Sequence, residues 1–298
     1  MTRTSGSPQG QGIWLEGVRI RGDDFPDCAI YPFNVPAFQG RQELRFTESV
    51  AFLVGENGSG KSTFIDAIAR RCGFHIWAQP KRSRAVTGWP LAGPAPSLGA
   101  AAASARHDVI KVDAAQPAGT PPPVVAGSPG GRAVSSYPAW ALSEYVDVTL
   151  ARGSVKGGVF TAESFREWAE FIDDVTDVDP GQARYHGGEK LTLRSRGEGL
   201  LAYFRGRYQI PGLYFLDEPE AALSPASQLE LLRLLSEYRR RGHAQFIIAT
   251  HSPIIMAVKG AQVFALGDGP IAETSHEQTP HYRLYRDFMA DPGRFVSD

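Results

Sequence analysis

The residues best suited to chemistry in this chain form an unbroken run of nine that fits the pattern G-x-x-x-x-G-K-[ST]. An apolar run, residues 50–54, precedes them, and a helical pattern follows. A strand that leads into a glycine-rich turn and then a helix directs backbone N–H groups and the positive end of the helix dipole toward a polyphosphate. We therefore expect this P-loop to bind a nucleoside triphosphate. The expected binding residues are Gly55, Glu56, Asn57, Gly58, Ser59, Gly60, Lys61, Ser62 and Thr63.

Two side chains of this run have separate expected roles. Lys61 can reach the β- and γ-phosphates, where its charge would also assist catalysis. The hydroxyl of Ser62 can ligate Mg²⁺. The sequence therefore predicts a Mg²⁺–nucleotide site and not only an anion site.

A pair of carboxylates, Asp217 and Glu218, follows the apolar run at residues 213–216. Such a run is typical of a strand buried on both faces of a parallel sheet, and ligands bind at the carboxyl ends of these strands. Asp217 is therefore expected to hold the Mg²⁺ shell together with Ser62. Glu218 is the expected catalytic residue that polarises the attacking water. The alternative is an ordinary turn with solvated carboxylates.

His251 follows another buried run, residues 246–249, and lies 33 residues after Glu218 (251 − 218). One helix and one strand fit within that distance, so His251 can return to the same edge of the sheet. Its imidazole is then expected to hydrogen-bond the γ-phosphate and to be the third catalytic side chain, with Lys61 and Glu218. The alternative is a histidine that simply satisfies its polar atoms at a strand end.

A second anion-receptive segment, Ser195-Arg196-Gly197, precedes an apolar helix that starts near Leu200. Serine is a preferred N-cap residue, and a helix start favours negative charge. Asp217 comes 22 residues later (217 − 195).

The elements that must position these residues alternate between strand and helix, which predicts an α/β core with a mostly parallel sheet. One long helix is expected from Pro225, with Ser224 as its N-cap and Gly242 as its stop. Its expected buried stripe is Leu229, Leu232 and Leu235. The other expected helices follow the P-loop as far as Gly73, cover residues 165–175, begin near residue 200, and cover residues 281–289. Further strands are expected at residues 14–20, 44–46 and 144–150, a further element of unassigned type begins at residues 159–160, and a hairpin is expected at residues 263–271.

Between Pro90 and Pro138, 32 of 49 residues are Ala, Gly, Pro or Ser. Such a segment buries too little apolar surface to offset the entropy of ordering it, so a flexible insertion is expected at about residues 80–140, with one weak strand at residues 107–112. Residues 1–12 are expected to be a disordered tail, and residues 13–298 a single domain.

Composition excludes few partners. The net charge of −1 gives no global sign of nucleic acid or membrane binding, although local basic clusters stand at residues 81–84 and 239–241. The two cysteines, Cys28 and Cys72, have no metal-ligand or redox spacing and fit a reducing cytoplasm. No apolar stretch approaches 18 residues, so no transmembrane segment is expected. The sequence thus predicts a cytoplasmic protein.

In this order, the four chemical segments resemble those of the ABC-type ATPase domain. GENGSGKST is similar to Walker A, SRGEG to a degenerate signature motif, FLDEPE to Walker B with its catalytic glutamate, and THS to the switch-histidine loop. The resemblance implies a P-loop NTPase of ABC-ATPase type with an N-terminal antiparallel β subdomain. It also implies a homodimer on ATP binding, in which Ser195 and Gly197 of one copy close over the ATP and Mg²⁺ held by the other.

The segments DEPEAALSP and QFIIATHSPII resemble those of soluble bacterial AAA-family ATPases related to the RecF, Rad50 and SMC-like branch. This implies ATP hydrolysis coupled to DNA or to an effector protein such as a nuclease. Two alternatives remain: the nucleotide-binding subunit of an ABC transporter, or an ATP-dependent dimerisation switch with little turnover. Arg196 departs from the transporter signature, Ser224 stands where transporters usually have an aspartate, and Gln79 is a weak candidate for the Q-loop.

Overall fold

A computed structural model of the chain describes residues 12–74, 124–126, 134–151, 153, 155–162, 165–178, 181 and 190–296. The first eleven residues, the candidate Q-loop residue Gln79, the basic cluster at 81–84 and the weak strand expected at 107–112 lie outside these ranges. Within the range of the expected insertion, two short strands pair antiparallel, β4 (Val124–Ala126) and β5 (Val134–Ser136).

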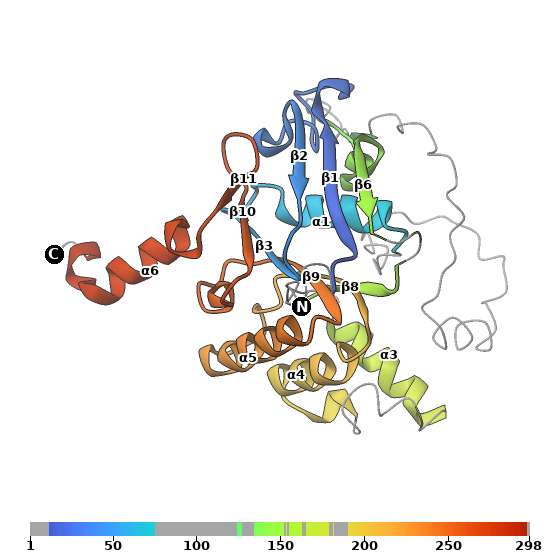
Figure 1. The fold of residues 1–298 in the computed structure, drawn as a ribbon, viewed down its shortest axis with the longest axis vertical. Coiled ribbons are helices and arrows are strands. Elements are labelled where there is room, and N and C mark those ends of the chain that lie inside the picture. Colours follow the sequence, from blue (N-terminus) through green and yellow to red (C-terminus); the bar gives the residue numbers. More distant parts are fainter. Residues whose placement is uncertain are drawn as a thin grey trace, which may run out of the picture.

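A six-stranded sheet forms the centre of the molecule (Figure 1). Neighbouring strands run parallel except at one edge, where β10 and β11 form the expected antiparallel hairpin. The carboxyl ends of the parallel strands therefore meet at one edge of the sheet. In spatial order the strands are β11 (Ala272–Thr274), β10 (Gln262–Ala265), β3 (Val50–Val54), β9 (Ala244–Ala249), β8 (Gly212–Asp217) and β7 (Gly157–Thr161).

The central strands are buried on both faces, as their continuous apolar runs predict. Successive side chains of β3 enter two different hydrophobic cores: Phe52 packs into one, and Ala51 and Leu53 into the other. Every residue of β3 and of β9 is buried. The sheet is therefore the middle layer of a three-layer α/β domain, and the predicted fold class is confirmed.

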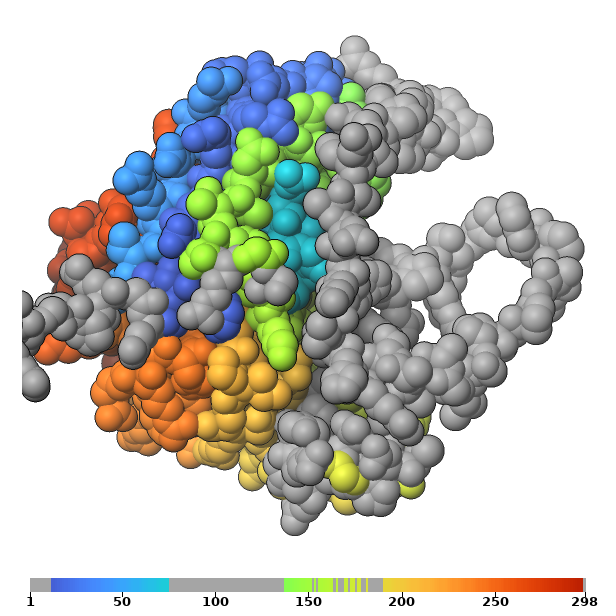
Figure 2. Space-filling view, turned by 45° about the vertical axis from the view of Figure 1, so that its right-hand side comes forward, coloured from blue at the N-terminus to red at the C-terminus, as the bar shows by residue number. Residues whose placement is uncertain are grey.

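Helices and a second sheet cover the two faces. The core on one face includes side chains of α3 (Phe165–Val178), α4 (Arg196–Arg207) and α5 (Pro225–Arg241). Helices α4 and α5 lie side by side on that side of the molecule (Figure 2). The core on the opposite face includes side chains of α1 (Lys61–Arg71). The 3₁₀ helices are η1 (Gly22–Asp24), η2 (Pro36–Phe38), η3 (Ala139–Tyr145), η5 (Leu191–Leu193), η6 (Ile255–Ala257), η7 (His276–Gln278) and η8 (Pro292–Phe295).

A three-stranded antiparallel sheet packs over the α1 side, in the order β2 (Arg41–Arg45), β1 (Leu15–Arg21), β6 (Val146–Leu150). The fully buried side chain of Gln245, on β9, ties it to the central sheet. The Gln245 Oε1 atom accepts hydrogen bonds from the amides of Trp14 (2.8 Å) and Leu15 (2.7 Å). The predicted N-terminal antiparallel β subdomain is thus present.

Two details of the sequence prediction were wrong. Leu229, expected in the buried stripe of α5, is 43% exposed, and the expected Leu232 is half-buried. Leu235 is buried as expected, together with Leu231 and Tyr238. These three have i, i+4, i+7 spacing, and Leu229 lies two residues before Leu231, on another face of the helix. The strand expected from residue 144 starts at Val146, because the 3₁₀ helix η3 extends to Tyr145.

The last helix, α6 (Pro280–Ala290), projects from the body of the domain (Figure 1). None of its residues is buried, although its spacing is amphipathic. Its exposed large apolar side chains include Leu284, Tyr285, Phe288 and Met289. Only its first turn lies near the residues that carry chemistry.

Candidate active site

The P-loop joins β3 to α1 at the carboxyl edge of the central sheet. Gly58 and Gly60 have positive φ values of 82° and 95°, which side chains disfavour. A Cβ atom on Gly60 would also lie 2.7 Å from the ring of Phe38 and 2.9 Å from Val35. The chain can therefore turn this tightly into α1 only with glycine at residue 60. No side chain caps the start of α1, so its first amides remain available to a ligand.

Lys61, the first residue of α1, is 4% exposed and folds back over the loop. Its Nζ atom donates to the carbonyl oxygens of Gly55 (2.9 Å) and Glu56 (3.0 Å). Burial lowers the pKa of Lys61, while the nearby carboxylates of Glu218 and Asp217 raise it. An ammonium group in this position can exchange its two carbonyl partners for phosphate oxygens.

Asp217 ends β8 directly opposite the start of α1, and the hydroxyl of Ser62 donates to its Oδ1 atom at 3.0 Å. Burial is the main cause that raises the pKa of Asp217 to about 6. Two oxygen atoms of the kind that Mg²⁺ prefers thus converge between the P-loop and β8. Among the described residues, no group of three His, Cys, Asp or Glu side chains forms a metal site. Mg²⁺ at this point would therefore depend on phosphate oxygens and water for its other ligands, as it commonly does.

Glu218 follows the end of β8 in a strained backbone conformation. Its φ is 48°, the one positive value among the non-glycine residues that the structure describes. Its amide donates to the carbonyl of Ala249 (2.9 Å), which holds it beside the end of β9. Its side chain is 44% exposed and therefore accessible to water. Because such strain tends to occur at functional sites, this conformation makes Glu218 a candidate for a chemical role.

His251 follows the end of β9, the strand next to β8. Its Nε2 atom lies 3.5 Å from Oε1 of Glu218 and has no hydrogen-bond partner within the described ranges. Burial and the positive charge of Lys61 lower the pKa of His251, which favours the neutral ring. The structure thus brings together five of the expected site residues: Lys61, Ser62, Asp217, Glu218 and His251.

Glu220, which sequence reasoning missed, positions the loop that carries His251. One carboxylate oxygen, Oε1, accepts from Thr250 Oγ1 (2.6 Å), His251 N (2.7 Å) and Ser252 N (3.2 Å). The spacing of Glu220 three residues after Asp217, in a turn that faces the next strand end, was the available signal. Burial raises the pKa of Glu220, and these hydrogen bonds oppose that effect.

Two further contacts with the site had no signal in the sequence. The Tyr31 hydroxyl and Thr63 Oγ1 lie 2.7 Å apart, which joins the loop before β2 to α1. His281, in the first turn of α6, lies with its Nε2 atom 3.1 Å from Nδ1 of His251. Nothing in the amphipathic pattern of α6 indicates that one of its side chains reaches the P-loop edge.

Ser195 and Gly197 lie apart from the P-loop of their own chain. Ser195 is the N-cap of α4 and forms a capping box with Glu198: its Oγ donates to Glu198 Oε2 (2.6 Å), and its amide also donates to Oε2 (3.1 Å). Ser195 is exposed and Gly197 half-buried. Within the part of the chain that the structure describes, no hydrogen bond or ion pair joins either residue to residues 55–63.

Two arginines of the basic cluster at residues 239–241 on α5 have structural partners. Arg239 pairs with Glu48 (2.6 Å), and Arg241 pairs with Glu237 and donates to Gln209 Oε1 (2.5 Å). Both long side chains therefore fix the helix to its surroundings or brace its last turn.

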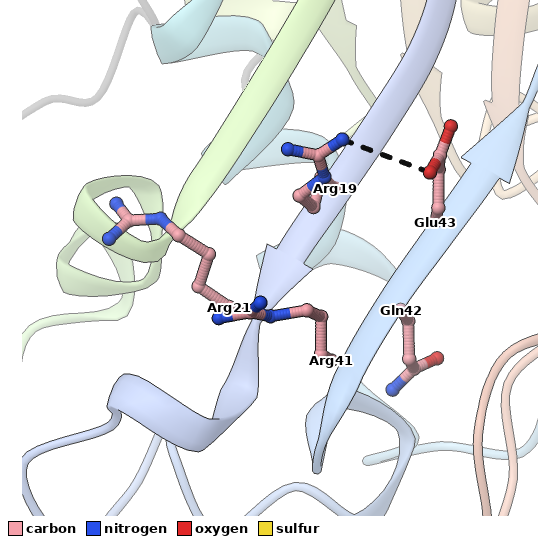
Figure 3. Close-up of a pocket in the computed structure, with 5 residues that line it drawn as sticks. All are labelled: Arg19, Arg21, Arg41, Gln42 and Glu43. Carbon is pink, nitrogen blue, oxygen red and sulfur yellow. Dashed lines mark ion pairs between the residues drawn. The ribbon is translucent and has the colours of Figure 1, made fainter.

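A separate basic surface lies on the antiparallel sheet, where Arg19, Arg21, Arg41, Gln42 and Glu43 line a pocket (Figure 3). Arg19 is paired with Glu43 at 3.9 Å, and Arg21 is paired with Asp147 at 3.2 Å. The positive charge of this surface is therefore partly neutralised. This pocket is formed by β1 and β2, not by the elements around the P-loop. In the described part of the chain, no helix is long and apolar enough to cross a membrane.

Two family models match the chain. One, described as the "P-loop containing region of AAA domain", matches residues 30–70. The other, described as "AAA domain, putative AbiEii toxin, Type IV TA system", matches residues 185–257. The first range includes the P-loop, and the second includes Ser195, Asp217, Glu218 and His251. The two segments that hold the candidate site residues are therefore each similar to part of an AAA-type P-loop domain.

Two curated relatives are ATP-binding proteins of export or import systems. The chain is 37% identical over 72 residues to the macrolide export ATP-binding/permease protein MacB of Marinobacter nauticus. The aligned segment covers 24% of this chain and 11% of MacB. It is 30% identical over 113 residues to the molybdenum import ATP-binding protein ModC of Rhizobium etli, which covers 38% of this chain and 30% of ModC. The chain thus spans less than a third of the length of either relative.

Solved structures with a similar course include the SMC head domain from Thermotoga maritima, at 19% identity and a TM-score of 0.43, covering 88% of this chain and 99% of that one. CbiO1 from Clostridium perfringens, part of the ABC transporter complex cbiONQ, has 15% identity and a TM-score of 0.45, covering 93% and 96%. TM-scores this low add no weight to the similarity that the two family models show.

Proposed function

We propose that this chain binds and hydrolyses Mg-ATP at a head-to-tail interface between two copies, and couples the cycle to a DNA-associated or effector process. The observation that carries the proposal is the convergence of Lys61, Ser62, Asp217, Glu218 and His251 at one edge of the sheet. These residues come from the starts or ends of α1, β8 and β9. Together they contain the charges and donors that phosphoanhydride hydrolysis needs.

Each residue has a role that follows from its position. Lys61 and the uncapped amides of α1 bind the phosphates, and Ser62 and Asp217 would hold Mg²⁺. The metal neutralises phosphate charge when it is bound. Glu218 faces solvent from a fixed backbone position and orients the attacking water. His251, neutral and with Nε2 free, donates a hydrogen bond to the γ-phosphate.

The second copy is proposed because the start of α4 is exposed and unconnected to the P-loop of the same chain. A helix start with Ser195 as N-cap and Gly197 in its first turn favours a phosphate group. In the proposed dimer, Ser195 and Gly197 of one copy meet the γ-phosphate held by Lys61 of the other. ATP would then join the two copies, and hydrolysis would release them.

The second candidate function is the nucleotide-binding subunit of a transporter, which the names of the two curated relatives favour. The two candidates differ in the partner with which the ATPase cycle is coupled. A transporter subunit would work with membrane helices supplied by another chain. A DNA-associated ATPase would contact phosphates through basic side chains, and the pocket lined by Arg19, Arg21 and Arg41 is one such surface. A dimerisation switch with little turnover does not need the strained, water-accessible Glu218.

The main test is Glu218→Gln, which keeps the shape of the side chain and removes its charge. We expect ATP binding within about threefold of wild type, hydrolysis at least about 100-fold slower, and a dimer that persists with Mg-ATP in size-exclusion chromatography with light scattering. The matched control is Glu277→Gln, at an exposed position in η7. Hydrolysis at the wild-type rate by Glu218→Gln would show that Glu218 does not orient the water.

The trapped dimer also tests the coupling. Affinity-tagged Glu218→Gln, purified with Mg-ATP and again without nucleotide, would retain its partner only in the first case. Co-purifying DNA whose retention falls steeply with salt supports the DNA-associated process, because phosphate contacts release counterions. A membrane protein recovered in its place supports the transporter subunit. A monomer in every sample contradicts the head-to-tail dimer.

A further inference from the structure

The first turn of α6 places a second histidine against the proposed catalytic one. His281 is the second residue of the helix. Its side chain is only 11% exposed, which sets it apart from the exposed apolar side chains further along α6. Its Nε2 atom lies 3.1 Å from Nδ1 of His251 and 3.8 Å from Oε1 of Glu56. The two rings meet edge to face, with centroids 5.1 Å apart. This contact joins a projecting C-terminal helix to the P-loop edge.

A hydrogen bond between two ring nitrogens contains one proton, so the two tautomers are coupled. If His281 carries the proton on Nε2, His251 must accept at Nδ1, and a neutral His251 then carries its own proton on Nε2. If His251 carries the proton on Nδ1, a neutral ring has only a lone pair at Nε2. Only the first arrangement lets His251 donate from Nε2.

The two carboxylates around the pair both favour the first arrangement. Oε1 of Glu218 lies 3.5 Å from His251 Nε2 and attracts a proton there. Oε1 of Glu56 lies near His281 Nε2 and favours a proton on that atom. In the opposite arrangement, each carboxylate would face a nitrogen lone pair. The charges of Glu218 and Glu56 therefore favour one direction for this chain of hydrogen bonds.

We propose that His281 is a positioning residue: it donates from Nε2 to His251 Nδ1 and so keeps the proton of His251 on the nitrogen that faces Glu218 and the γ-phosphate. This inference depends on the proposed function, because the γ-phosphate role of His251 is part of it. His281 itself touches neither the nucleotide nor the attacking water. The hydrogen bond made by one ring nitrogen fixes which nitrogen of an imidazole carries the proton.

The test compares two substitutions. His281→Leu removes the donor, and His281→Gln replaces it with an amide N–H at a similar distance from the backbone. We expect His281→Leu to lower kcat about 10- to 100-fold with ATP affinity changed less than about threefold, and His281→Gln to recover kcat to within about fivefold of wild type. Leu284→Gln, on the exposed surface of α6, is the control and should keep wild-type kinetics.

A spectroscopic readout separates positioning from a merely structural role. The ¹⁵N shifts of ring nitrogens distinguish protonated from unprotonated atoms, and the His251 signals among the seven histidines can be assigned by their loss in His251→Gln. In nucleotide-free wild-type protein, His251 should be protonated at Nε2 and not at Nδ1, and His281→Leu should give a mixture of tautomers. Wild-type protonation at Nδ1 would overturn the inference, as would equal kcat values for His281→Leu and wild type.

The two proposals fail in different ways. If wild-type protein hydrolyses no ATP, the proposed function fails, while the tautomer measurement still decides whether His281 directs the proton of His251. If ATP is hydrolysed and His251→Ala/His281→Leu is no slower than His251→Ala alone, His281 acts through His251 as inferred. Additive losses in the double variant would show that His281 acts separately and would overturn the inference.

Discussion

Two helix starts in this molecule suit an anion, and they differ in how their first amides are satisfied. At α1, Gly60 occupies the N-cap position and no side chain caps the helix. At α4, Ser195 and Glu198 form a complete capping box. An N-cap side chain is worth about 0.5–2 kcal/mol, so α1 lacks a stabilising contact that α4 has. The difference indicates that the start of α1 is built for a ligand, whereas α4 is stable by itself.

The side chains around the two helix starts also indicate a ligand site at α1 and not at α4 alone. Around α1 lie Lys61, the Ser62–Asp217 pair, Glu218 and His251, which together provide for binding and chemistry. At the start of α4, the exposed Ser195 is bonded to Glu198, and no comparable group of cationic and metal-binding side chains surrounds it within the described residues. One helix start therefore holds most of a site, and the other has the properties of a closing surface. In the proposed dimer, the two helix starts meet at one ATP molecule.

The largest effect is expected at the α1 side. Lys61→Ala removes the buried ammonium that lies over the loop, so ATP binding should weaken at least about 100-fold and turnover should be lost. Isothermal titration calorimetry with ATP and a phosphate-release assay would measure the two effects. Lys259→Ala, at an exposed position after η6, is the control and should leave both quantities unchanged.

A smaller effect is expected at the α4 side. Ser195→Asp keeps an oxygen that can cap α4, loses the hydroxyl that donates to Glu198 Oε2, and directs a carboxylate at the γ-phosphate of the partner copy. Each P-loop should still bind ATP within about threefold of wild type, whereas hydrolysis should fall about 10- to 100-fold. Ser195→Asn, an equally good cap without charge, should retain more activity than Ser195→Asp. Equal losses in both variants would indicate a role for the serine hydroxyl other than the one proposed.

Mixing the two impaired variants tests the head-to-tail arrangement directly. In a heterodimer of Lys61→Ala and Ser195→Asp, one of the two sites combines an intact P-loop with an intact α4 start. Part of the wild-type activity should therefore return on mixing, in proportion to the heterodimer formed. If activity does not return although heterodimers are detected, the two segments do not share a site.

Much of the α1 side could be predicted from the sequence, because its parts are local. The P-loop, the buried runs before Asp217 and His251, and the helix between Ser224 and Gly242 each carry their own signal within a few residues. The parallel order of the strands then brings their carboxyl ends to one edge. Fold class and the placement of these residues followed from such patterns alone.

What the sequence did not show depends on contacts between distant segments. Glu220 positions the loop of His251 from 31 residues away, and His281 reaches His251 across 30 residues. Leu229 was placed in the core because its spacing with Leu232 fits a helix face. The face that packs is set by the neighbouring α4 and the sheet, which the periodicity of α5 does not contain.

The smallest expected effect is on the free energy of unfolding and comes from Asp217, opposite the start of α1. It tests whether this carboxylate is costly to the folded protein until a ligand binds. Burial raises the pKa of Asp217 from 3.8 to about 6, so the folded protein without metal binds this proton more tightly than the unfolded chain. The free energy of unfolding should therefore fall as the pH rises from about 4 to about 6, and the loss should persist at neutral pH. A shift of about two units corresponds to roughly 3 kcal/mol before any discount for partial exposure.

Asp217→Asn removes this cost, because a neutral amide can still accept from Ser62. In the presence of EDTA and without nucleotide, the variant should be about 1–3 kcal/mol more stable than wild type at pH 7.5, and the gain should shrink to about a third at pH 4.5. Urea denaturation at the two pH values measures both gains. With Mg-ATP the order should reverse, because only the wild-type carboxylate would help to hold the metal and a bound ligand stabilises the folded state. A gain that is the same at both pH values would contradict the assigned cause, since the cost of a buried ionised carboxyl must disappear when the carboxyl is protonated.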